Sequence, residues 1–250
     1  MPALELRGLT KRFGARAAVD DVTLEVPRGS FYGLVGPNGA GKTTTLAMAT
    51  GLLRPDQGTA LVEGIDVWRS PLEAKRLIGN LADGADVYDR LTGEQLIIFS
   101  GLLFGLDRAT IRRRAADLLR VLDLEDAART IVAEYSAGMA KKASLAAALV
   151  HSPRVLVLDE PFESVDPVST AAIRDLLRQF TSGGGTVVLS SHSMDLVQRT
   201  CDHVAVLADG RVLAAGPIDD VRGDDDLESR FLELVGRRDH GESPAWLLPS

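Results

Sequence analysis

The chain has 250 residues, 45% of them hydrophobic, and a formal net charge of −7 at pH 7. This length and apolar content suit one large α/β domain with an insertion, or two closely packed lobes. The acidic balance argues against a nucleic-acid partner, because such proteins usually present a basic face. The single cysteine, Cys201, excludes an internal disulfide and a cysteine zinc site, and we expect it to be a small buried hydrophobe.

The sequence contains no stretch that predicts a secretory signal or a membrane-spanning helix. Residues 1–8 include Glu5 and Arg7 in place of a continuous apolar core. The longest strongly apolar stretch, residues 95–106, is shorter than the roughly 20 residues that a helix needs to cross a bilayer. We therefore expect a soluble, cytoplasmic protein, with residues 95–106 packed inside it or beneath a partner.

Two half-exposed strands are predicted near the start of the chain, over residues 4–9 and 22–26, because apolar and polar residues alternate there. Phe13 precedes a glycine in the loop predicted between these strands, where its ring is available to stack on a flat partner. Residues 30–36 then predict a buried strand and residues 42–53 a helix, which the glycine and proline residues after it terminate.

Residues 36–44 connect that strand to that helix and fit the phosphate-loop pattern G-x-x-x-x-G-K-[ST]. The glycines let consecutive backbone N–H groups turn towards a β-phosphate at the positive end of the helix. Lys42 is predicted to neutralise the β- and γ-phosphates, and Thr43 to bind Mg²⁺. The loop residues expected to bind nucleotide are Gly36, Pro37, Asn38, Gly39, Ala40, Gly41, Lys42, Thr43 and Thr44.

Helical patterns replace strand patterns after this region, and we interpret residues 84–153 as a helical lobe inserted into an α/β core. Ser136 is a suitable N-cap, and the small residues after it leave the N-terminus of its helix open to an anion. The helices expected in the lobe cover residues 91–103, 111–122 and 136–150.

The later part of the chain returns to alternating strands and helices. The pattern predicts an α/β fold of the P-loop NTPase class, with a mainly parallel central sheet, helices on both faces and an N-terminal antiparallel part. Residues 1–220 are expected to form this nucleotide-binding domain, and residues 221–250 a C-terminal helix and a frayed tail. The other predicted elements are strands over residues 59–67, 78–81, 154–158 and 186–191, helices over 71–77, 168–180 and 193–201, and a hairpin over 204–214.

Two acidic residues at the end of the buried run 154–158 favour nucleotide hydrolysis. Asp159 stands where a carboxylate reaches Mg²⁺ beside the phosphate loop, and Glu160 is placed to hold the attacking water as general base. His192 follows a strand that we expect to lie beside the first, and it is predicted to hydrogen-bond the γ-phosphate. The predicted catalytic residues are thus Glu160, His192 and Lys42, acting on a nucleoside triphosphate with Mg²⁺ as cofactor.

The ordered motifs resemble those of one family, the ATP-binding subunits of ATP-binding cassette (ABC) transporters, over about residues 3–220. The phosphate loop alone is shared by many ATPases and GTPases, whereas a signature sequence ahead of the acidic strand is far more specific. The other matching segments are Tyr135-Ser136-Ala137-Gly138-Met139 as the signature, residues 155–160 as the acidic strand, Ser164-Val165-Asp166-Pro167 as the D-loop, and His192 as the switch histidine.

The resemblance implies that two such domains meet head to tail. Each ATP would lie between one subunit's phosphate loop and Ser136, Ala137 and Gly138 of the other. Phe13 would stack on the adenine, and Asp166 would cross the interface. ATP would close the dimer and hydrolysis would open it, driving a separate transmembrane permease from the cytoplasmic face of the cell membrane. The second ATP-binding subunit would be another copy or a close relative.

Two positions depart from the family pattern. Asp83 stands where the family usually has glutamine or glutamate, so we expect it to join Thr43 and Asp159 at Mg²⁺ with a shorter reach. Ala137 replaces the first glycine of the signature, and its methyl group is expected to weaken closure modestly.

The pattern, including Glu160-Pro161-Phe162, is most similar to subunits that serve drug or antibiotic exporters. Two other hypotheses stay open at this point. One is a soluble regulatory or DNA-repair ATPase of the same fold, and the other is a nucleotide-gated binding module that hydrolyses ATP poorly. The transported substrate is not encoded in this chain, and export is favoured over import without being settled.

Overall fold

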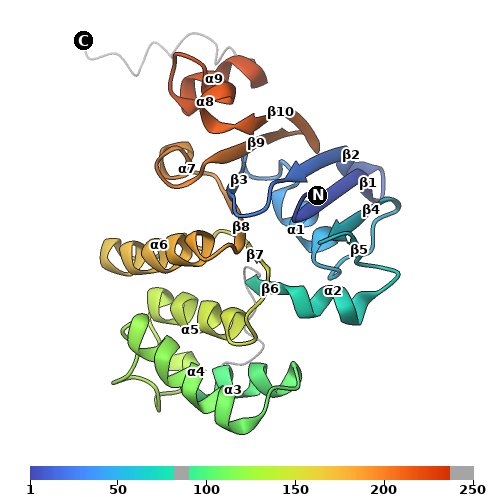
Figure 1. Ribbon diagram of the computed structural model, residues 1–250. Coiled ribbons are helices and arrows are strands. Elements are labelled where there is room, and N and C mark those ends of the chain that lie inside the picture. The colour runs from blue at the N-terminus through green and yellow to red at the C-terminus, as the bar shows by residue number, and fades with distance from the viewer. Residues whose placement is uncertain (82–89, 237–250) are drawn as a thin grey trace, which may run out of the picture.

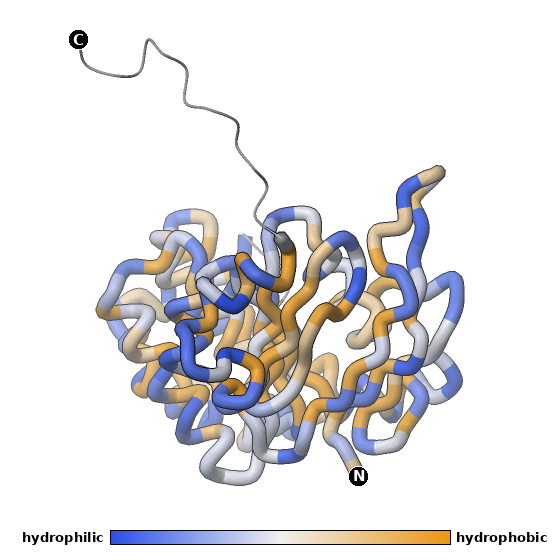
Figure 2. The backbone as a smooth tube through the Cα atoms, turned by 90° about the horizontal axis from the view of Figure 1, so that it is seen from above, coloured by the Kyte–Doolittle hydropathy of each residue, from blue (hydrophilic) through white to orange (hydrophobic). Residues whose placement is uncertain are grey.

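The computed structural model describes residues 1–81 and 90–236. They form two β-sheets, helices that cover the larger sheet, and a helical lobe at one end (Figure 1). Hydrophobic stretches run through the middle of the molecule, and hydrophilic stretches lie mostly at its periphery (Figure 2). Within the described ranges, no helix is both long enough and apolar enough to span a membrane.

The smaller sheet is antiparallel, which confirms the predicted N-terminal part of the fold. Its strands β1 and β2 extend beyond their predicted ends, and Phe13 still pairs with Arg16 across the turn. The sequence pattern placed Phe13 in a loop. In the structure it is the last residue of β1. The strands are β1 (Leu4–Phe13), β2 (Arg16–Val26), β4 (Gln57–Val62) and β5 (Ile65–Asp66), in the order β2-β1-β4-β5.

The larger sheet has the order β10-β9-β3-β8-β7-β6, and its pairs are parallel apart from the antiparallel β9–β10 edge. Strands β3, β7 and β8 are buried at every residue, which explains their continuous apolar character. This confirms the predicted mainly parallel sheet. The strands are β3 (Phe31–Val35), β6 (Ile78–Leu81), β7 (Val155–Leu158), β8 (Thr186–Ser191), β9 (His203–Ala208) and β10 (Arg211–Pro217).

Alternate residues of the buried strands face two hydrophobic cores. Val155 and Val157 of β7 join the core that the antiparallel sheet and α1 enclose, whereas Leu156 and Leu158 join the core under α6 and α7. The second core continues into the helical lobe, so the sheet and the lobe share one packed interior. The helices outside the lobe are α1 (Lys42–Ala49), α2 (Pro71–Leu77), α6 (Pro167–Ser182), α7 (Met194–Thr200), α8 (Ile218–Arg222) and α9 (Leu227–Val235).

Helix α1 is shorter than the sequence pattern predicted. It ends at Ala49, because Gly51, two residues later, adopts the left-handed region at φ +73°. Within the predicted C-terminal segment, residues 221–250, the structure has the helix α9, and residues 237–250 lie outside the described residues.

The lobe contains three α-helices among the described residues, and their N-termini are capped by side chains. Thr92 and Gln95 form a capping box, and Asp107 and Ser136 each accept a backbone N–H at the start of their helices. The elements are α3 (Gly93–Leu103), α4 (Arg108–Val121), the short 3₁₀ helix η1 (Val132–Glu134) and α5 (Ala137–Leu149), close to the helices predicted.

His151 lies where the lobe joins the sheet. Its ring stacks on Phe104 with centroids 3.6 Å apart, and Nε2 lies 3.0 Å from the carbonyl oxygen of Ile78 in β6. Its Nδ1 is buried without a hydrogen-bond partner in the described part of the chain. Burial, with the nearby Arg114 guanidinium as a smaller cause, lowers the pKa of His151 to about 4.

We expect this histidine to make stability depend on pH. Its pKa of about 4 in the folded state lies below the ordinary value of 6.5, so the unfolded state binds more protons between these values. The stabilisation is therefore complete above pH 6.5 and is lost as the pH falls towards 4. After allowance for screening at a partly exposed ring, the loss is up to about 2 kcal/mol.

The measurement is urea unfolding at neutral and acidic pH, for the native chain and for His151→Gln. Glutamine keeps an N–H donor for the Ile78 carbonyl but does not titrate in this range. We expect the variant to lose less stability on acidification than the native chain. Equal losses in the two proteins would show that His151 makes no such contribution.

Candidate nucleotide-binding and hydrolytic site

The phosphate loop joins β3 to α1 and is held against the antiparallel sheet. Gly41 has φ +103°, and a Cβ placed on it would lie 2.5 Å from the carbonyl oxygen of Ala18 in β2. A Cβ on Gly36 would clash in the same way with the carbonyl oxygen of Leu207 in β9. The loop therefore needs glycine at both positions for packing, independently of any ligand.

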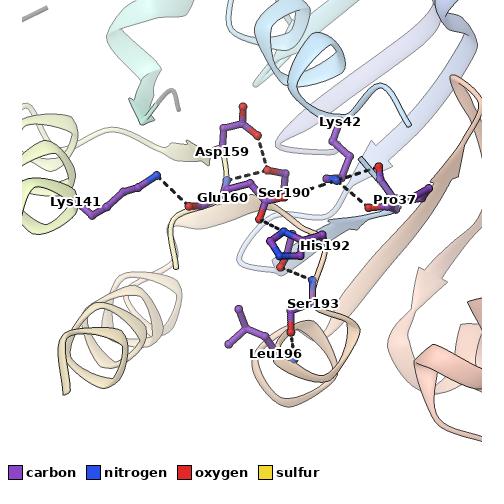
Figure 3. Close-up of polar contacts among 11 residues, drawn as sticks. Pro37, Lys42, Lys141, Asp159, Glu160, Ser190, His192, Ser193 and Leu196 are labelled. Carbon is purple, nitrogen blue, oxygen red and sulfur yellow. Dashed lines mark hydrogen bonds and ion pairs between the residues drawn. The ribbon is translucent and has the colours of Figure 1, made fainter. Parts of the chain in front are cut away.

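Lys42, the first residue of α1, turns back into the loop. The residue is 6% exposed, and Nζ donates to the carbonyl oxygens of Gly36 at 2.8 Å and Pro37 at 3.4 Å. The same nitrogen lies 3.6 Å from Oε1 of Glu160 (Figure 3). Lys42 and Glu160, which were predicted from motifs far apart in the sequence, thus form an ion pair.

Asp159 and Glu160 follow directly on β7. Asp159 is 5% exposed and its Oδ1 accepts a hydrogen bond of 2.5 Å from the hydroxyl of Ser190. The oxygen of that hydroxyl in turn accepts the backbone N–H of Glu160 at 2.9 Å. Ser190 of β8 therefore fixes the acidic pair to the neighbouring strand.

Ser190 was not predicted from the sequence as a site residue. The available signal was weak, since it consisted of a polar Ser190-Ser191 pair that ends an otherwise apolar strand. Ser190 is fully buried, so its hydroxyl requires a partner, and that partner comes from a strand remote in sequence.

His192 lies beside Glu160, because β7 and β8 are adjacent parallel strands, as predicted. Its Nδ1 is 3.1 Å from Oε2 of Glu160 (Figure 3). Glu160 itself has φ +44°, an uncommon backbone conformation for a residue other than glycine. Its carboxylate is thereby placed between Lys42 on one side and His192 on the other.

A pocket of about 430 Å³ extends from the phosphate loop towards the antiparallel sheet. Phe13 stands on its wall with 55% of its surface exposed. Arg16 also lines it, and its guanidinium donates to the Gly39 carbonyl at 3.3 Å. The lining residues are Phe13, Arg16, Ala18, Asn38, Gly39, Ala40, Gly41, Lys42, Thr43, Thr44, Glu160, Glu163 and His192, among which Arg16, Ala18 and Glu163 were not predicted.

The predicted signature residues lie away from this pocket, at the start of α5. Ser136 is the N-cap, with its hydroxyl accepting the Met139 N–H at 3.2 Å. A Cβ on Gly138 would lie 3.0 Å from Oδ2 of Asp166. Ser136, Ala137 and Gly138 are absent from the described residues that line the phosphate-loop pocket of their own chain.

Asp166, the predicted D-loop residue, caps α6. Its Oδ1 accepts the backbone N–H groups of Ser169 at 2.9 Å and Val168 at 3.0 Å, and the hydrogen bonds from Ser169 are the main cause of its lowered pKa. Asp83, the remaining predicted metal ligand, lies outside the described residues.

Comparison with known proteins identifies the family. The family model described as ABC transporter matches residues 19–163. The chain is 40% identical over 232 residues to the daunorubicin/doxorubicin resistance ATP-binding protein DrrA of Streptomyces peucetius, covering 93% of this chain and 70% of that protein. It is also 40% identical over 217 residues to the Nod factor export ATP-binding protein I of Ralstonia nicotianae, covering 86% of this chain and 67% of that protein.

A solved structure of an ATP-binding subunit of an ABC transporter superposes on the chain with a TM-score of 0.87, at 30% identity and covering 94% of this chain and 100% of that one. The fold and the family that the motifs predicted are therefore confirmed. The chain belongs to the ABC transporter family, in which it is an ATP-binding and ATP-hydrolysing subunit of an ABC exporter.

Proposed function

We propose that this subunit binds Mg-ATP in the phosphate-loop pocket, hydrolyses it with Glu160 as general base, and works as one of two head-to-tail subunits under a separate permease. The observation that carries the proposal is the position of the Glu160 carboxylate. It lies 3.6 Å from Nζ of Lys42 and 3.1 Å from Nδ1 of His192, at the edge of the pocket. We thus assign three roles to one site: Glu160 is the general base, Lys42 the phosphate-binding cation and His192 the γ-phosphate sensor.

Phe13 and the phosphate loop are proposed to hold the two ends of the nucleotide. The exposed Phe13 ring lines the same pocket as the loop, which supports its stacking on adenine. The backbone of residues 36–44 would surround the phosphates, with Lys42 as the main protein cation.

Thr43 and Asp159 are proposed to hold Mg²⁺. Thr43 is exposed in the pocket, and Asp159 is a buried carboxylate at the carboxyl end of β7. Hydroxyl and carboxylate oxygens are ligands that Mg²⁺ prefers, so the donor set fits the ion. When bound, the ion would supply positive charge to the phosphate oxygens. Asp83 completes the proposed set but lies outside the described residues.

The signature residues are proposed to act on the ATP of a second subunit, either another copy or a close relative. Their distance from the pocket of their own chain supports this arrangement, because an N-terminal helix end attracts anions and this one faces no phosphate loop of its own. Asp166 is proposed to couple the two sites through its position beside Gly138.

A membrane permease is proposed as the other partner, which places the subunit on the cytoplasmic face of the membrane. Leu102 and Leu103 of α3 are 47% and 66% exposed, an apolar surface suited to a partner. The name of the DrrA relative suggests a drug or antibiotic as cargo.

We propose that the chain consists of a nucleotide-binding domain over residues 1–220, with the helical lobe at about 84–153, and a C-terminal segment over residues 221–250.

A pull-down from detergent-solubilised native membranes tests the proposal. Tagged Glu160→Gln chain with Mg-ATP is expected to recover a polytopic membrane protein in a near-stoichiometric amount. The same bait carrying Leu102→Glu and Leu103→Glu should lose that protein, because two carboxylates would have to be buried at the contact. Recovery of soluble proteins only, by both baits, would favour a regulatory or repair ATPase instead.

A further inference from the structure

Lys141 connects the helical lobe to the backbone of Glu160. It lies on α5, five residues after the N-cap Ser136, and its Nζ donates to the Glu160 carbonyl oxygen at 3.1 Å (Figure 3). Glu160 follows β7 in the central sheet. This hydrogen bond joins the helix that begins at the signature to the acidic pair of the same chain.

The peptide groups on both sides of Glu160 are held. Its N–H donates to the Ser190 hydroxyl at 2.9 Å, and its carbonyl accepts the N–H of Glu163 at 3.2 Å as well as Lys141. Its backbone has φ +44°, and such a conformation persists only where the surroundings determine it from several sides. Of these contacts, that of Lys141 is the one that comes from the lobe.

The side chain of Glu160 depends on this backbone placement. A general base acts only within hydrogen-bond reach of the water that it deprotonates. A small rotation of the Glu160 peptide would move its carboxylate relative to Lys42 and His192, which lie on α1 and directly after β8. The hydrogen bond from Lys141 opposes that rotation.

We propose that Lys141 is a positioning residue, through which the position of the signature helix α5 determines the position of the Glu160 carboxylate. A helix rises about 1.5 Å per residue, so Ser136 and Lys141 are separated by little more than one rigid turn. A shift of the signature end on contact with the second subunit is then carried directly to the Glu160 carbonyl. This proposal rests on the proposed role of Glu160 as general base.

The test compares the steady-state kinetics of Lys141→Met and Lys141→Arg in the full chain with Mg-ATP. Methionine keeps most of the apolar stem and removes the N–H donors, whereas arginine keeps them. We expect Lys141→Met to lower kcat about tenfold with KM for ATP within about twofold, and Lys141→Arg to restore most of kcat. The Glu163 N–H still satisfies the carbonyl in the variant, so the fold is expected to persist.

Lys75→Met on α2 is the matched control, because this lysine is exposed and outside the site. It is expected to leave kcat unchanged. The proposal is overturned if Lys141→Met keeps a kcat within about twofold of the native value. It is also overturned if Lys141→Arg loses as much kcat as Lys141→Met does. If Glu160→Gln also retained full kcat, the proposed base itself would be wrong. If Glu160→Gln were inactive and Lys141→Met fully active, the proposed role of Lys141 would be wrong, while Glu160 would remain the proposed base.

Discussion

Replacing Glu160 with glutamine is expected to lower kcat for ATP hydrolysis by about 100-fold or more, while ATP affinity stays within about threefold. Glutamine has nearly the same shape but cannot accept the proton of the attacking water. Lys42 and the loop that surrounds the phosphates remain in place, so binding persists. The measurements are steady-state phosphate release and calorimetric titration with Mg-ATP.

The same variant should accumulate as an ATP-bound dimer, because the step that opens the dimer is blocked. Light scattering after size exclusion with Mg-ATP would detect it. Adding Ser136→Arg is the control, since a long cation at the start of α5 would occupy the space proposed for the second subunit's phosphate. A double variant that still dimerises would contradict the head-to-tail arrangement, and a Glu160→Gln chain with native kcat would contradict the assignment of the base.

The sequence predicted well those parts of the site that short, contiguous sequence motifs specify. The phosphate loop is a contiguous motif between a buried strand and a helix, and the structure has both elements at these places. The proximity of Glu160 and His192 was also predictable, since each follows a buried apolar strand and parallel strands end at the same edge of a sheet.

The contacts that tertiary packing creates were not predictable in this way. Ser190 and Lys141 hold the two sides of the Glu160 peptide, but neither belongs to a motif that names a hydrogen-bond partner. Lys141 lies in the sequence just after the signature, and nothing local indicates that its amine reaches a carbonyl in another layer. Such pairs depend on how the lobe docks against the sheet.

Backbone geometry explains the remaining differences. Phe13 extends β1 because the turn after it is tight enough for Phe13 and Arg16 to pair, and periodicity does not specify where pairing stops. The early end of α1 has a similar origin, as Gly51 leaves the helical region at φ +73° two residues after Ala49. Neither shift moves a predicted nucleotide-binding residue away from the pocket, where Phe13 and Thr43 both lie.

Replacing Lys42 with alanine is expected to abolish tight ATP binding, with a loss of affinity of about 100-fold or more. Lys42 is buried and its amine is already aligned by the Gly36 and Pro37 carbonyls, so it meets a phosphate with little loss of entropy. Removing a buried, charged donor forfeits roughly 3 kcal/mol, which corresponds to about two orders of magnitude. Calorimetric titration with Mg-ATP measures the change.

Two comparisons make the Lys42 result specific. Lys75→Ala removes the same charge from an exposed position on α2 and should bind ATP as the native chain does, which separates a local effect from the net charge. Lys42→Arg keeps the charge but is expected to bind weakly as well, because a planar guanidinium does not fit the space that the loop leaves for an ammonium group. Native affinity in Lys42→Ala would mean that the backbone of residues 36–44 alone holds the phosphates, and Lys42 would then serve chiefly to neutralise Glu160.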